Sequence, residues 1–303
     1  MDNQPAYVKL LRDGELKTRM QILERHLKSC DLCPRVCGTN RYQDETGICG
    51  VGRFAWVTSY GPHFGEEDPL RGWKGSGTIF FSGCNLNCLY CQNANISQTL
   101  SGEMVTPKQL AHMMLELENR GCHNINLVSP THVSAQILQA VYLAAQLGLR
   151  LPIVYNSGGY DSVEVLRLLD GIIDIYMPDM KYTDPKKGEK YSGVIDYPVL
   201  NKLAVTEMHR QVGDLKLTEQ GVASRGLLVR HLVLPGDLAG STEILSFLAE
   251  RISKNTYINI MDQYRPAYQA NRHHELNRRI SDDEYQHVLS EAKRLGINRI
   301  DTR

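Results

Sequence analysis

The sequence has neither an excess of one charge nor a long apolar segment. Lysine plus arginine and aspartate plus glutamate each number 34 among its 303 residues, so the formal net charge is zero. Because nucleic-acid-binding proteins usually carry a basic excess, we expect no nucleic acid as the main partner. No uninterrupted apolar run of about 18 residues occurs, so we also expect no membrane-spanning helix and no membrane partner.

The amino-terminal residues lack targeting features. The stretch MDNQPAYVKLLRDGELKTRM has no apolar core like that of a secretory signal, and it is not the serine- and arginine-rich, acid-poor kind of transit peptide. We therefore expect a cytoplasmic protein. Its eight cysteines are then poor candidates for a disulfide framework, because the cytosol keeps thiols reduced, and metal binding or catalysis is the better interpretation.

Seven of the eight cysteines fall into two tight groups that divide the chain into two regions. Residues 1–75 are predicted to form a small cysteine-rich metal-binding region, and residues 76–303 a larger core with a C-terminal helix. The two groups are Cys30, Cys33, Cys37 and Cys49, followed by Cys84, Cys88 and Cys91. The eighth cysteine, Cys122, follows a predicted helix and is interpreted as a small buried residue.

From residue 76 onward, short apolar runs alternate with helical patterns. Several runs are apolar without strict alternation, as expected of strands that are buried on both faces. Helices are predicted from Thr106 and Pro107 to Arg120, over Val133–Leu147 and after Ser281. The predicted strands are Thr78–Ser82, Asn124–Ser129, Pro152–Ser157, Ile172–Met177, Leu227–Leu234 and Tyr257–Met261.

This alternation predicts an α/β fold with a parallel sheet and right-handed crossovers. Six strands suit a partial (β/α)6 barrel of the TIM type, which is the favoured architecture. A doubly wound open sheet is the alternative, because the same pattern permits it.

The segment GCNLNCLYCQN, residues 83–93, directly follows the first predicted strand. Its cysteines therefore lie at the C-terminal end of that strand, where barrel enzymes place their catalytic groups. The spacing C-x3-C-x2-C supplies three thiolates to an iron–sulfur cluster that normally takes four, which leaves one iron open. The alternatives are a zinc site completed by a histidine and a C-x2-C redox pair with a spare cysteine.

These residues resemble the radical S-adenosylmethionine (SAM) superfamily, and within it relatives of pyruvate formate-lyase activating enzyme, over roughly residues 76–265. The resemblance implies that Cys84, Cys88 and Cys91 hold a 4Fe–4S cluster and that SAM chelates the open iron. An electron from a reductant such as flavodoxin or ferredoxin then cleaves SAM to methionine and a 5′-deoxyadenosyl radical, which abstracts hydrogen from a substrate.

The resemblance also implies further SAM contacts. Tyr90 occupies an aromatic position near the adenine, and Lys181 in an Asp-x-Lys segment meets the methionine carboxylate. Where the family often has Gly-Gly-Glu, this chain has Ser129-Pro130-Thr131-His132, so hydroxyl groups or backbone carbonyls there are candidates for holding the methionine ammonium. The residues implied to bind SAM are Tyr90, Ser129, Thr131, Asn156, Ser157, Asp179, Lys181 and Arg230.

The four N-terminal cysteines have the spacing C-x2-C-x3-C-x11-C, which is a complete ligand set. Structural zinc and an auxiliary iron–sulfur cluster are both compatible with it, and the spacing does not separate them. Among the histidines, only His132 lies at a predicted strand end, and it is a weak candidate for a ligand or an acid–base group. The basic segments Lys181–Lys190 and Asn271–Arg279 would favour an acidic substrate or partner loop if they flank the barrel mouth.

The sequence thus predicts a radical SAM oxidoreductase with an unidentified substrate. One version is an activase that installs a glycyl radical on a partner protein, as the resemblance implies. The alternative from another class is a non-catalytic iron–sulfur or zinc protein that carries electrons or acts as a scaffold.

Overall fold

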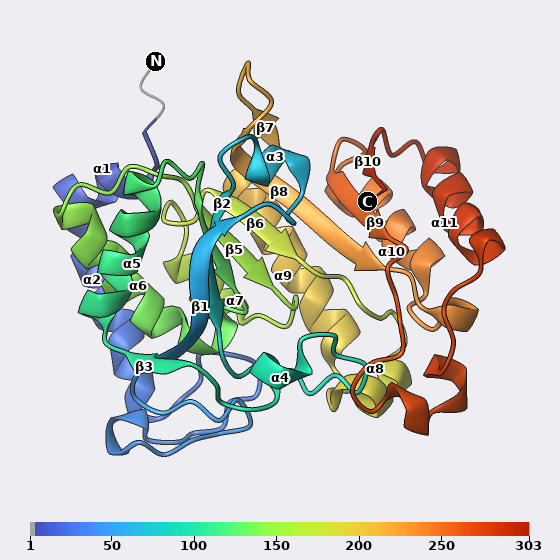
Figure 1. The fold of residues 1–303 in the computed structure, drawn as a ribbon, viewed down its shortest axis with the longest axis horizontal. Helices are drawn as coiled ribbons and strands as arrows, with labels where there is room; N and C mark the ends of the chain where they lie inside the picture. The colour runs from blue at the N-terminus through green and yellow to red at the C-terminus, as the bar shows by residue number, and fades with distance from the viewer. Residues whose placement is uncertain (1–3, 303) are drawn as a thin grey trace.

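The computed structural model describes residues 4–302, and a ten-stranded sheet runs through this part of the chain (Figure 1). The strand order is β10-β9-β8-β6-β5-β4-β2-β1-β3, with β7 paired to β8. The strands are β1 (Ala55–His63), β2 (Ser76–Phe81), β3 (Glu103–Val105), β4 (Ile125–Val128), β5 (Ile153–Ser157), β6 (Ile175–Pro178), β7 (Lys216–Leu217), β8 (Ala223–Leu232), β9 (Tyr257–Met261) and β10 (Arg299–Asp301).

Strands β2, β4, β5, β6, β8 and β9 are parallel and adjacent in chain order. These are the six strands predicted from the sequence, and the α/β fold is confirmed. A doubly wound sheet reverses its strand order at a switch point. No reversal occurs among these six strands, so their order is consistent with a partial barrel.

Helices cover the outer face of the sheet, with α1, α2, α5 and α6 grouped together at the left of the view (Figure 1). Both α5 and α11 begin at the predicted positions, and each starts with a capping box, at Thr106 and at Ser281. The helices are α1 (Tyr7–Arg12), α2 (Glu15–Arg25), α3 (Asp68–Arg71), α4 (Ala94–Ser97), α5 (Pro107–Asn119), α6 (Ser134–Gln146), α7 (Val163–Leu168), α8 (Pro185–Ser192), α9 (Tyr197–Val212), α10 (Ser241–Phe247) and α11 (Asp282–Arg294).

The predicted start of β6 was too early. Ile172 and Ile173 are buried, but their amides bond to the carbonyl of Leu169 in the turn after α7. Asp174 then accepts hydrogen bonds from the amides of Ile153 and Ala6, which fixes the entry to β6. Apolarity at residues 172 and 173 therefore reflects burial in a turn and not pairing in the sheet.

The first 75 residues join the same sheet. Strand β1 pairs antiparallel with β2 on one edge and with β3 on the other, and it was not predicted. Tyr7 of α1 is buried and donates its hydroxyl to the carbonyl of Leu151 at 2.9 Å. The division at residue 75 remains a prediction. Between residues 4 and 302, no helix combines the length and apolarity needed to cross a membrane.

Candidate functional site

The loop that carries Cys84, Cys88 and Cys91 connects β2 to α4 and borders a pocket of about 240 Å³. The C-terminal ends of β4, β5, β6, β8 and β9 supply the opposite wall, because parallel strands end at one edge of the sheet. The lining residues are Cys84, Leu86, Cys88, Tyr90, Cys91, Gln92, Asn93, Ser97, Gln98, Val128, Ser129, Asn156, Ser157, Gly158, Asp179, Lys181, Arg230, Leu232, Met261 and Gln263.

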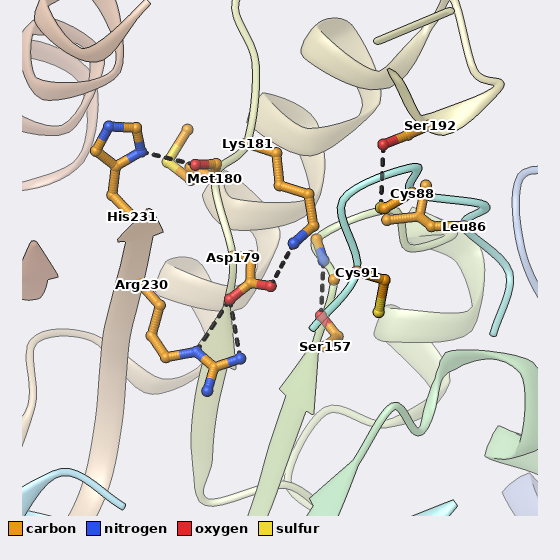
Figure 2. A network of polar contacts seen from close by, with 12 residues as sticks. Leu86, Cys88, Cys91, Ser157, Asp179, Met180, Lys181, Ser192, Arg230 and His231 are labelled. Carbon is orange, nitrogen blue, oxygen red and sulfur yellow. Dashed lines mark hydrogen bonds and ion pairs between the residues drawn. The ribbon is translucent and has the colours of Figure 1, made fainter. Parts of the chain in front are cut away.

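Asp179 is the central charged residue of this pocket and lies just after β6 (Figure 2). Its Oδ2 accepts from Lys181 Nζ at 2.7 Å, and its Oδ1 accepts from Arg230 Nε at 2.9 Å. The three side chains are between 16% and 23% exposed. Burial would raise the pKa of Asp179, but the charges of Arg230 and Lys181 outweigh it and lower the pKa. Asp179 is therefore ionised and holds both cations in place.

Two of the three sulfur atoms each have one serine hydroxyl within hydrogen-bond distance. Ser192 donates to Cys88 Sγ at 3.0 Å (Figure 2), and Ser97 Oγ lies 3.1 Å from Cys91 Sγ. Burial raises the pKa of Cys84 to about 12 and also raises that of Cys88, which the charge of Lys181 opposes. Ligation of iron needs thiolates, and the neighbouring hydroxyls and Lys181 are groups that stabilise them.

The residue types in this pocket are those that a cluster with one open iron requires. Three cysteines line the pocket, and no fourth cysteine does so within residues 4–302. Hydroxyl, amide and charged groups from the strand ends face the same space. Among the described residues, no three histidine, cysteine, aspartate or glutamate side chains already stand in an arrangement that could hold a metal ion.

The structure brings most of the implied SAM-binding residues together. Tyr90, Ser129, Asn156 and Ser157 line the pocket together with Asp179, Lys181 and Arg230. Thr131 is not among its lining residues. Its buried hydroxyl donates instead to Asp161 Oδ1 at 2.6 Å.

Asp161 is a buried acceptor that sequence reasoning missed. Besides Thr131, it accepts from Ser157 at 2.7 Å and from Tyr155 at 3.1 Å. Asp161 thereby orients Ser157 at the end of β5, without lining the pocket itself. Nothing in the local sequence marks this role, because the three donors come from two strand ends separated by a helix.

Ser129 adopts an unusual backbone conformation at the end of β4, with φ of 58°. Residues other than glycine rarely occupy this region, which costs of order 1–3 kcal/mol. Such strain is often found where a site requires a specific backbone direction. Because Ser129 borders the pocket, the strained peptide supports the interpretation of this segment as a ligand contact.

His132 lies behind the cysteine loop and does not line the pocket. It is fully buried, and its Nε2 lies 2.9 Å from the carbonyl of Ser82. Burial lowers its pKa to about 4, so the ring is neutral at physiological pH. His132 therefore has a structural role, because its ring contacts the backbone of Ser82, just before Gly83.

The N-terminal cysteines gather around a buried arginine. Arg41 is 1% exposed, and it donates to the carbonyl of His132 at 2.7 Å and to Cys49 Sγ at 3.4 Å. Burial raises the pKa of Cys33 to about 12 and also raises that of Cys30, and the charge of Arg41 opposes both shifts. The positive charge of Arg41 therefore acts on several thiols at once.

Gly83 is the point where the two cysteine regions meet, and we expect Gly83→Ala to destabilise the protein. Its φ is 80°, and a Cβ there would lie 2.4 Å from the carbonyl oxygen of Cys49. The positive φ and the clash together should cost at least about 2 kcal/mol. Urea denaturation and iron content measure the effect, and Gly61→Ala is the control because a Cβ at Gly61 meets nothing within 4 Å. Equal stability of the two variants would contradict this close approach.

Comparison with known proteins identifies a family. A model described as the radical SAM superfamily matches residues 78–204, a range that contains the three cysteines, Asp179 and Lys181 and ends before Arg230. The chain is also similar to an uncharacterized protein of Methanocaldococcus jannaschii, MJ0674. The two sequences are 30% identical over 308 aligned residues, which cover 98% of this chain and 83% of that protein.

Proposed function

Because the chain belongs to the radical SAM superfamily, we propose that it reductively cleaves SAM and uses the resulting radical chemistry to remove a hydrogen atom from a second molecule. The observation that carries this proposal is the pocket in which three cysteines face the charged and polar ends of five strands. A carrier or scaffold needs no such space beside its metal. The family match supports an enzyme, but neither the family model nor the relative identifies the substrate.

In this proposal Cys84, Cys88 and Cys91 hold a 4Fe–4S cluster. When bound, the cluster and SAM supply the one-electron cleavage of the sulfonium. Lys181 is positioned by Asp179 at 2.7 Å and provides the cation for the methionine carboxylate. Asn156 and Ser157 at the end of β5 offer amide and hydroxyl groups for the ribose.

A group of buried aromatic side chains protects the cysteine loop from water. Tyr90 and Tyr182 pack with the loop residue Leu86, and the hydroxyl of Tyr182 donates to that of Tyr90 at 2.7 Å. Tyr182 also lies 2.9 Å from Ser192, the residue that donates to Cys88. Exclusion of water strengthens the electrostatic interactions in the pocket and limits side reactions.

The proposal predicts a cluster whose EPR signal responds to SAM. Anaerobically reconstituted protein, reduced with dithionite, should give a 4Fe–4S spectrum that changes when SAM is added, because SAM binds the open iron. Cys122→Ala is the control, since Cys122 is buried outside the pocket. A reduced cluster whose spectrum is identical with and without SAM would contradict the proposal.

The finer resemblance to pyruvate formate-lyase activating enzyme suggests activation of a partner protein, with flavodoxin or ferredoxin as the reductant. This activase role is tested by mixing the reduced protein, SAM and a glycyl radical enzyme. Appearance of a glycyl radical EPR signal supports it, and cleavage of SAM without such a signal argues for a different substrate.

We further propose that Cys30, Cys33, Cys37 and Cys49 bind a metal as four thiolates. Arg41 supports this, because no carboxylate pairs with it in the described chain and its Nε has no hydrogen-bond partner. An unpaired buried charge costs several kcal/mol. A tetrathiolate metal site carries net negative charge, and it would neutralise the guanidinium.

The proposed N-terminal site is in contact with the cluster loop. Arg35, between Cys33 and Cys37, donates to the carbonyl of Asn85 at 2.9 Å and to that of Gly193 at 2.9 Å. Arg41 reaches the carbonyl of His132, whose ring meets Ser82. A metal that orders the N-terminal loop would therefore also fix the backbone on both sides of Cys84.

Metal analysis tests this second site separately from the first. The variant with Cys84, Cys88 and Cys91 all replaced by alanine should retain about one zinc or about four irons per chain. Zinc identifies a structural site, and iron identifies an auxiliary cluster. When Cys33→Ser is combined with this triple variant, the remaining metal should be lost. If the folded triple variant contains neither zinc nor iron, the N-terminal site is not a metal site.

A further inference from the structure

A second cavity of about 680 Å³ adjoins the SAM pocket. One wall comes from the end of β1 and the segment that leads to α3, including His63, Phe64, Glu66 and Glu67. Six residues line both spaces: Asn93, Val128, Asn156, Arg230, Met261 and Gln263. A molecule in the second cavity would therefore lie beside whatever occupies the SAM pocket.

A polar layer forms the strand wall of this cavity. On β4, Ile125 and Leu127 belong to the core beneath the helices, so the alternation of side chains turns Asn126 to the inner face. Asn156, Arg230 and Asn259 come from β5, β8 and β9 and line the cavity directly. The residues two positions before these three on the same strands are Val154, Leu228 and Tyr257, which belong to an apolar cluster.

Two acceptor atoms in this layer have no partner. Glu67 and Asn259 are each 6% exposed, and Glu67 Oε1 accepts from Asn259 Nδ2 at 3.0 Å. Their other oxygens, Glu67 Oε2 and Asn259 Oδ1, are buried without a hydrogen-bond partner. The carboxyl group of Glu66 approaches both the amide of Asn126 and the carboxylate of Glu67. Each unpartnered oxygen costs about 1–3 kcal/mol. Glu67 Oε2 and Asn259 Oδ1 are both acceptors, so a ligand that satisfies them must donate hydrogen bonds.

The charges of the cavity favour a cation. Both of its arginines have carboxylate partners outside it, since Arg230 pairs with Asp179 at 2.9 Å and Arg71 with Asp68 at 2.7 Å. Glu66 and Glu67 lie close enough that burial and the charge of Glu67 raise the pKa of Glu66 to about 7, which Arg230 opposes. A positively charged group between the two carboxylates would relieve their repulsion.

The basic segments do not make the cavity suitable for an acidic molecule. Lys190 forms an ion pair with Glu275, and Arg278 pairs with Glu284 at 2.6 Å. None of these four residues lines the second cavity. The expectation of an acidic substrate or partner loop depended on these segments flanking the barrel mouth, and neither ion pair lines this cavity.

We propose that the second cavity binds a small aliphatic amine, with its ammonium group against Glu66 and Glu67. The role of this amine as the substrate of the radical chemistry rests on the proposed function. Its binding to the cavity does not. The ammonium group donates to Glu67 Oε2 and Asn259 Oδ1, and the carbon chain extends past Asn156 and Val128 toward the SAM pocket.

Three four-carbon probes separate the classes of ligand by charge. Each probe is titrated into the reconstituted, unreduced protein in the presence of SAM, and binding is measured by isothermal calorimetry. We expect 1,4-diaminobutane to bind at least about tenfold more tightly than 1,4-butanediol, and succinate to show no detectable binding. Glu67→Gln retains the shape and removes one charge, so it should weaken the diamine by about tenfold, which corresponds to 1.4 kcal/mol. Glu219→Gln on the exposed turn between β7 and β8 is the matched control and should change nothing.

Absence of diamine binding, equal binding of diamine and diol, or preference for succinate would overturn the amine site. An unchanged affinity in Glu67→Gln would also overturn it. Because no reductant is present, these results are independent of SAM cleavage. Diamine binding to a protein that never cleaves SAM would leave the site standing and refute the proposed function.

Discussion

Replacing Asp179 with asparagine is expected to lower the free energy of unfolding by about 3 kcal/mol, because it leaves two largely buried cations without their carboxylate. Lys181 and Arg230 both bond to Asp179. The variant should also bind SAM at least about tenfold more weakly, since Lys181 loses the partner that positions it. Urea denaturation and equilibrium dialysis with SAM measure the two effects.

The pH dependence of stability gives an independent check on Asp179. Burial opposes the shift, but Arg230 and Lys181 lower its pKa in the folded protein. Its contribution is therefore fully present above the ordinary carboxyl pKa of about 3.9 and is lost as the pH falls through the lower folded value. Asp179→Asn should lose this part of the acid dependence.

Asp170→Asn, at a more exposed ion pair with Arg210, should cost about 1 kcal/mol or less. Equal losses in the two variants would contradict a central role for Asp179.

Cys88→Ala is expected to abolish binding of the 4Fe–4S cluster at the pocket. Two thiolates do not hold a cubane that already lacks its fourth protein ligand. Iron content, the visible absorption of the cluster and its EPR signal measure the loss in anaerobically reconstituted protein. If the N-terminal site holds iron, the variant should retain about four irons per chain and lose the response of the spectrum to SAM.

Two controls separate loss of the cluster from loss of the fold. Cys122→Ala removes a buried thiol just after α5 that does not line the pocket, and should retain a full cluster. Ser192→Ala removes the hydroxyl donor to Cys88 Sγ and leaves the three ligands intact. A Cys88→Ala protein whose cluster still responds to SAM would contradict the assignment of Cys88 as a ligand.

The sequence predicted the part of the site that depends on strand ends. The strand pattern placed Cys84 at the C-terminal end of the first parallel strand, and the family resemblance implied that Asn156, Asp179 and Arg230 lie near it, although 146 residues separate Cys84 from Arg230. The structure places all four around one pocket. Residues so far apart in sequence can meet because alternation of strands and helices brings the same end of each parallel strand to one edge. The role of these residues in binding a cluster and SAM stays a prediction.

Other parts of the site depended on loops and on the antiparallel edge, where no periodic signal exists. Glu66 and Glu67 reach the second cavity because β1 pairs with β2, and β1 itself was not predicted. Thr131 was expected at the ligand, yet the buried carboxylate of Asp161 takes its hydroxyl. Arg41 among the N-terminal cysteines is a long-range contact that spacing alone does not reveal.

The most direct test of the central claim is formation of 5′-deoxyadenosine. Reconstituted wild-type protein, incubated without oxygen with dithionite and SAM, should release 5′-deoxyadenosine and methionine in amounts that exceed those of Cys88→Ala by at least two orders of magnitude. Equal amounts from the two proteins, with the wild-type cluster shown to be intact, would contradict the account.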